Sequence, residues 1–172
     1  MTRATAALAA LLLATAARAE EPKKATAARA QLEKLKALAG TWKGKAGEPG
    51  SDKTFDAVVT YRVTGAGSAV VEIIGPGTPH EMVTVYHLDG DDLLLTHYCA
   101  AGNQPTMRAV KSDAPDVLAF DFLRGSNMKP TDVHMHSARI QLPGPDKVIG
   151  DWVSWQDGKP ASTMRFDLAR QK

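Results

Sequence analysis

The pattern of apolar and polar positions changes at Gly40. Between Lys24 and Leu38, alanines and leucines recur every three or four residues among Lys, Glu and Gln, which predicts an amphipathic helix that stops at Gly40. Beyond Gly40 short runs rich in Val, Thr, Tyr and Phe alternate with clusters of Gly, Pro, Asp and Asn, which is typical of strands and turns. The expected strands cover residues 41–46, 54–64, 67–74, 81–88, 92–99, 105–111, 117–123, 132–142, 147–156 and 160–170.

Several connections between these strands are short enough for tight hairpins. They are the segments 64–67 (TGAG), 89–91 (DGD), 143–146 (PGPD) and 156–159 (QDGK). Consecutive strands joined by tight turns form an up-and-down meander, and closure of a meander removes its exposed edges. We therefore predict an all-β fold, a single antiparallel up-and-down β-barrel of about 8–10 strands with a short N-terminal helix.

The first residues have the pattern of a secretory signal peptide. Arg3 precedes an uncharged Ala/Leu-rich run, and Ala17-Arg18-Ala19 fits an A-x-A cleavage site. The apolar run is about 12 residues long, whereas a membrane-spanning helix needs about 20. We expect residues 1–19 to be the signal peptide, 20–39 the helix and linker, and 40–172 the barrel domain. The mature protein is then periplasmic or secreted and has no integral membrane segment.

Charge and motifs exclude several classes of partner. Removal of residues 1–19 takes two of the 21 basic residues and leaves 19 against 19 acidic ones. Nucleic-acid binding needs clustered Lys and Arg, so we expect none. No Gly-rich phosphate loop or nucleophile elbow is present, so the sequence assigns no cofactor and no catalytic residue, and we expect a binding protein rather than an enzyme.

Strand alternation predicts which side chains point into the barrel. In the run 132–142 the apolar positions Ala138, Ile140 and Leu142 place His134 and His136 on the inner face. The same reasoning, with Leu88 opposite Leu93 in the hairpin 81–99, gives the remaining inner positions. They are Phe55, Ala57, Val59, Tyr61, Val63, Met82, Thr84, Tyr86, Leu88, Leu93, Leu95, His97, Cys99, Met107, Ala109, Leu118, Phe120 and Phe122.

The predicted interior therefore contains several groups that need partners. A buried polar group without a hydrogen bond costs about 1–3 kcal/mol, so these groups must bond to one another or to a guest. We expect them to bind a small, partly polar organic ligand, with Phe55, Phe120, Phe122 and Met107 as apolar walls. The candidate ligand-binding residues are Tyr61, Tyr86, His97, Cys99, Met107, His134 and His136.

Three other interpretations of these residues remain open. His134 and His136, with His97 or Cys99 as a further ligand, suit a metal or haem site. A histidine near Tyr86 suits acid/base catalysis. Alternatively, each histidine bonds to a backbone carbonyl or a buried tyrosine, and the barrel is a structural or interaction module.

The segment Leu38-Ala39-Gly40-Thr41-Trp42 resembles the Gly-x-Trp opening of lipocalins and fatty-acid-binding proteins. The resemblance implies that Trp42 closes one end of the barrel, and Arg170 suits the role of the arginine that packs on it. The chain also resembles, over most of its mature length, an uncharacterised family of exported bacterial lipocalin-like (calycin-type) proteins, a domain of unknown function. The segments that carry this resemblance are 85–91 (VYHLDGD), 95–99 (LTHYC), 102–105 (GNQP) and 134–136 (HMH).

Overall fold

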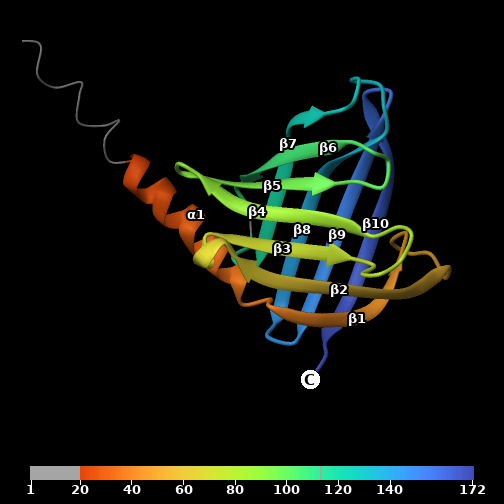
Figure 1. Cartoon of the computed structure of the whole chain (residues 1–172), viewed down its shortest axis with the longest axis horizontal. Coiled ribbons are helices and arrows are strands. Elements are labelled where there is room, and N and C mark those ends of the chain that lie inside the picture. Colours follow the sequence, from red (N-terminus) through yellow and green to blue (C-terminus); the bar gives the residue numbers. More distant parts are fainter. Residues whose placement is uncertain (1–19, 113) are drawn as a thin grey trace, which may run out of the picture.

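A computed structural model describes residues 20–112 and 114–172, so the expected signal peptide lies outside the described residues. One helix, α1 (Glu20–Lys36), precedes a succession of antiparallel strands (Figure 1). The strands are β1 (Gly40–Gly47), β2 (Thr54–Thr64), β3 (Ala69–Ile74), β4 (Met82–Asp89), β5 (Asp92–Tyr98), β6 (Gln104–Val110), β7 (Val117–Ser126), β8 (His134–Gly144), β9 (Lys147–Gln156) and β10 (Lys159–Arg170).

Each strand pairs with its neighbours in sequence, and β1 closes the barrel by pairing with both β2 and β10. Trp42 on β1 lies opposite Val59 of β2 on one side and Arg170 of β10 on the other. The prediction of a closed, antiparallel up-and-down barrel with a short N-terminal helix is confirmed, and every expected strand is present with its ends shifted by a few residues.

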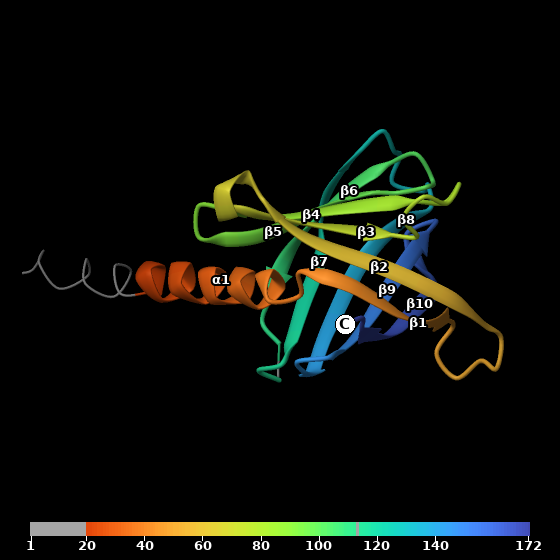
Figure 2. The same ribbon diagram turned by 60° about the horizontal axis from the view of Figure 1, so that its bottom comes forward.

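Helix α1 lies against one end of the barrel, where it contacts β2 to β5 (Figure 2). Its apolar stripe, including Leu32 and Leu35, is buried in the core together with Trp42. The guanidinium of Arg170 lies over the Trp42 ring at 4.3 Å and donates hydrogen bonds of 2.8 Å to the carbonyls of Ala37 and Ala39. The expected Trp42–Arg170 contact is therefore present, and it fixes the chain between α1 and β1 to the last strand.

Of the inner positions predicted on β2, those in the middle of the strand are buried and those near its ends are exposed. Ala57, Val59 and Tyr61 are buried as expected, but Phe55 is 53% exposed and Val63 is 37% exposed. The alternation is intact, but β2 is 11 residues long. Phe55 and Val63 each lie one residue from an end of the strand, where the core covers them only in part.

Among the described residues, no helix has both the length and the apolar character needed to cross a membrane.

Candidate functional site

A row of polar side chains crosses the inner faces of β2 to β5. The strand register places Tyr61 opposite Glu72, Glu72 opposite Thr84, and Thr84 opposite His97. All four side chains are buried. Because directly opposed residues on one face of a sheet are in contact, the register builds a continuous polar row through an otherwise apolar core.

Glu72 is the centre of this row. The Tyr61 hydroxyl donates to its Oε1 at 2.8 Å and the Tyr86 hydroxyl donates to its Oε2 at 2.6 Å. Burial raises the pKa of Glu72 above its ordinary value, and hydrogen bonds from Tyr86, Tyr61 and Thr84 oppose this rise. Burial, and then the charge of Glu72, raise the pKa of both tyrosines well above the usual value, so both remain hydroxyl donors.

His97 ends the row with one ring nitrogen bonded and the other free. Its Nδ1 lies 2.9 Å from the Thr84 hydroxyl, and its ring lies against Trp152 with centroids 5.0 Å apart. Nε2 is buried and has no hydrogen-bond partner among the described residues. Burial lowers the pKa of His97 to about 4, so the ring is neutral at neutral pH.

A second cluster forms where β7 and β8 separate. Their pairing ends at Asp121 opposite Ser137, and beyond this point β7 continues along β6 while β8 continues along β9. On β8, His136 is the extra residue of a bulge between Met135 and Ser137.

The bulge shifts by one residue the alternation that was expected to carry both histidines inward, so His134 and Ala138 no longer share a face by the register. Met135, opposite Ser154, packs against the core, while His134 is opposite Trp155 on the other face. His134 is nevertheless only 5% exposed, because Phe122 of β7 packs against it. His136 is partly exposed.

The rings of this cluster form a continuous stack. His136 lies 3.7 Å from Trp155 with planes 10° apart, and 5.0 Å from Phe122 with planes 13° apart. His134 Nε2 lies 3.0 Å from His136 Nδ1, and His134 Nδ1 lies 2.8 Å from the carbonyl oxygen of Asp132. Burial and the neighbouring His134 lower the pKa of His136, although Asp121 opposes them.

These rings line a cleft of about 370 Å³, which we call the mouth cleft. Its remaining walls come from the β7–β8 and β9–β10 connections, so it lies at the end of the barrel opposite α1. The lining residues are Phe122, Gly125, Met128, Lys129, Pro130, His134, His136, Trp155 and Gly158.

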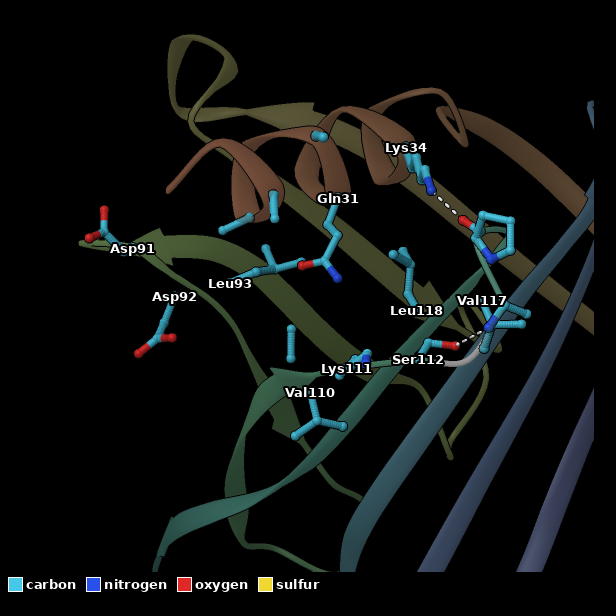
Figure 3. Close-up of a pocket in the computed structure, with 16 residues that line it drawn as sticks. Gln31, Lys34, Asp91, Asp92, Leu93, Val110, Lys111, Ser112, Val117 and Leu118 are labelled. Carbon is cyan, nitrogen blue, oxygen red and sulfur yellow. Dashed lines mark hydrogen bonds between the residues drawn. The ribbon is translucent and has the colours of Figure 1, made fainter. Parts of the chain in front are cut away.

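A larger cleft, of about 520 Å³, lies at the α1 end of the barrel (Figure 3). Gln31 and Lys34 of α1 face Leu93 and Leu118 across it, with Asp91 at its rim. The Lys34 ammonium donates to the Pro115 carbonyl and so is already bonded across the cleft. The mouth cleft differs from this one in its aromatic walls and its two adjacent imidazoles.

The residues proposed from sequence divide into separate groups. Tyr61, Tyr86 and His97 belong to the interior row, while Met107 is packed in the core. His134 and His136 line the mouth cleft.

Cys99 is a free, partly buried thiol just beyond β5. In the part of the chain that the structure describes, no group of three or more His, Cys, Asp or Glu side chains is placed to hold a metal ion. The three candidate histidines belong to two different clusters, because His97 contacts Thr84 and Trp152 while the other two contact each other.

Sequence reasoning missed Glu72 and Trp155. Glu72 carries a usable signal, because it is a lone acid in the apolar run 69–74 and alternates with Val70 and Ile74. Trp155 has no such signal in its own strand, since its contact with His136 depends on the bulge in β8.

Comparisons with known proteins show the fold. No protein-family model matches the chain, and no curated protein matches it. The crystal structure of Rv2717c from M. tuberculosis is similar, with a TM-score of 0.53 and 19% identity over 82% of this chain and 97% of that one. A protein of unknown function from the DUF3598 family of Nostoc punctiforme has a TM-score of 0.53 and 14% identity over 80% of this chain and 49% of its own. At these identities the two neighbours show that the chain shares their fold.

Proposed function

We propose that this protein binds a small, partly polar aromatic molecule in the mouth cleft. The observation that carries the proposal is the cleft itself. Its volume of about 370 Å³ lies within the usual range for small-molecule sites, and its aromatic walls, Phe122 and Trp155, adjoin the polar edges of two imidazoles. Apolar walls with a few placed polar groups are typical of sites that bind organic ligands.

The interior row supports a ligand at the mouth rather than at the centre of the barrel. Tyr61 and Tyr86 donate their hydroxyls to Glu72, and Thr84 is bonded to His97. Apart from Nε2 of His97, these polar atoms bond to one another, so the centre presents few free polar groups for a ligand. The polar row is then part of the scaffold, and the ligand is held where β7 and β8 separate.

Trp155 is the residue through which we test the proposal. Trp155→Ala is expected to weaken binding of fused-ring aromatic ligands about tenfold or more, because it removes a wall of the cleft and the support of His136. Binding is measured by ligand-observed NMR with the purified protein, and co-purifying molecules are sought by native mass spectrometry.

Phe55→Ala is the matched control, because Phe55 is an exposed aromatic residue outside the mouth cleft. It is expected to leave binding unchanged. If no member of an aromatic library binds saturably to the wild type, or if both variants weaken binding equally, the proposal fails.

A second candidate is haem or single-metal ligation through His136. It is favoured by one observation, that Nε2 of His136 has no hydrogen-bond partner among the described residues. An absorption band that appears when haem is added, and that is lost in His136→Phe, would favour this candidate over an organic ligand.

We also propose that the protein is exported. The basis is the sequence of residues 1–19, with Ala17-Arg18-Ala19 as the cleavage site. Expression of the full chain in a bacterium is expected to give a mature protein that begins at Glu20 and lies outside the cytoplasm. Intact mass measurement after fractionation tests this, and an unprocessed cytoplasmic chain would contradict it.

A further inference from the structure

We propose that the mouth cleft selects aromatic ligands that carry a hydrogen-bond donor, a phenol-like O–H or an indole-like N–H, and that Nε2 of His136 accepts this bond. The inference rests on the proposed ligand-binding function and adds the chemical class of the ligand. It follows from the direction in which hydrogen bonds must run through the two histidines.

The direction is set at Asp132. The Asp132 carbonyl oxygen lies 2.8 Å from Nδ1 of His134, and a carbonyl can only accept a hydrogen bond. Nδ1 of His134 therefore carries a proton. In a neutral imidazole the other nitrogen is then an acceptor, so Nε2 of His134 has a lone pair to offer.

His136 donates a hydrogen bond to this lone pair. Its Nδ1 lies 3.0 Å from Nε2 of His134 and must donate to it, so Nδ1 of His136 is protonated. A neutral imidazole that carries its proton on Nδ1 leaves Nε2 of His136 unprotonated. No described residue forms a hydrogen bond with this atom. The atom is not fully buried either, and because His136 lines the cleft, Nε2 is accessible from it.

The ring of His136 cannot readily turn away. It is stacked on both Trp155 and Phe122, at 3.7 and 5.0 Å between centroids and with nearly parallel planes. Because the lone pair of Nε2 lies in the ring plane, the stack also fixes the direction from which a donor must approach. A ligand that slides along the aromatic walls therefore meets an acceptor with a defined orientation.

The lining offers no other free nitrogen or oxygen acceptor among its side chains. Lys129 only donates, and both nitrogens of His134 are already used. The other lining residues are Phe122, Gly125, Met128, Pro130, Trp155 and Gly158, whose side chains carry no oxygen and no nitrogen acceptor. An aromatic ligand without a donor would cover Nε2 of His136 and leave it unsatisfied, which lowers its affinity.

The test is a matched pair of ligands. 2-Naphthol and 2-methoxynaphthalene share a fused ring, but only the naphthol donates a hydrogen bond. At pH 7 the wild type is expected to bind 2-naphthol about three- to tenfold more tightly. In His136→Phe, which keeps a flat ring in the stack, the ratio is expected to fall to about one while 2-methoxynaphthalene still binds.

Two further measurements keep the test decisive. His80→Ala, at an exposed histidine outside the cleft, should retain the wild-type ratio. If His136→Phe does not fold, as judged by circular dichroism, nitrogen-15 NMR of the wild type replaces it. The Nε2 signal of His136 should then be that of an unprotonated nitrogen and should shift when 2-naphthol is added, but not when 2-methoxynaphthalene is added.

The possible failures are distinguishable. If neither ligand binds, the proposed function itself is wrong. If both bind equally well, the cleft binds aromatic molecules but does not select a donor. A preference for 2-naphthol that survives in His136→Phe, or a protonated Nε2, would likewise overturn the assignment to His136.

Discussion

Replacing Glu72 with alanine is expected to lower the free energy of unfolding by about 3–5 kcal/mol. The side chain is 3% exposed and accepts the hydroxyls of both Tyr61 and Tyr86. Glu72→Ala leaves two buried hydroxyls without an acceptor and opens a cavity in a close-packed core, and each effect alone destabilises a protein. Urea denaturation of the purified variant measures the change.

Glu72→Gln is the control that separates packing from charge. Glutamine keeps the side-chain volume and one hydrogen-bond acceptor, so Glu72→Gln should lower the free energy of unfolding less than Glu72→Ala does. Because burial raises the pKa of Glu72, the wild type is most stable, relative to Glu72→Gln, below the ordinary value of 4.5. This advantage should be lost as the pH rises through the raised pKa. A Glu72→Ala variant that loses less than about 1 kcal/mol would show that the polar row is not part of the scaffold.

The barrel could be predicted because its signals are local. Alternation within each strand and turn residues between strands define the meander, and closure follows from the need to pair its edges. The contact of Trp42 with Arg170 was also expected, although these residues lie at opposite ends of the barrel sequence. That expectation came from the resemblance to lipocalins. Closure explains why the two residues meet, because β1 and β10 are neighbours.

The mouth cleft could be predicted only in part, because it depends on a break in the alternation. His134 and His136 stand out in the sequence, but strict alternation assigns both to the inner face. The bulge at His136 shifts the register so that His134 lies opposite Trp155, and the His136 ring stacks on the same tryptophan. A bulge is one unpaired residue, and its only trace in the sequence is a change of phase in the apolar positions, which are odd at Val133 and Met135 and even from Ala138 onward.

The interior row illustrates a different limit. Glu72 can be placed on the inner face from its own strand, since Val70 and Ile74 flank it at alternate positions. The hydrogen-bond partners of Glu72 cannot be predicted in this way, because they depend on the register between β2, β3 and β4. A slip of one residue in that register would place Tyr61 opposite an outward side chain, so the polar row also makes the correct register the favourable one.

The second large effect is expected at acidic pH and depends on His97. Its folded-state pKa, lowered to about 4 by burial, lies below the ordinary value of 6.5, so the unfolded chain binds the proton more tightly than the folded chain. The stability that His97 contributes is complete above pH 6.5 and is lost as the pH falls towards 4. Over that interval the loss amounts to about 3 kcal/mol.

The comparison with His97→Gln isolates this contribution, because all other titrating groups are common to both proteins. Gln keeps a polar partner for Thr84 and does not titrate. The free energy of unfolding of the wild type should therefore fall more steeply between pH 6.5 and 4 than that of His97→Gln. His80→Gln, at an exposed position, should follow the wild type. Equal slopes for the wild type and His97→Gln would contradict this prediction. They would mean that His97 binds its proton as readily in the folded barrel as in the unfolded chain. That is not expected of a ring that is buried against Trp152 and has no partner for Nε2.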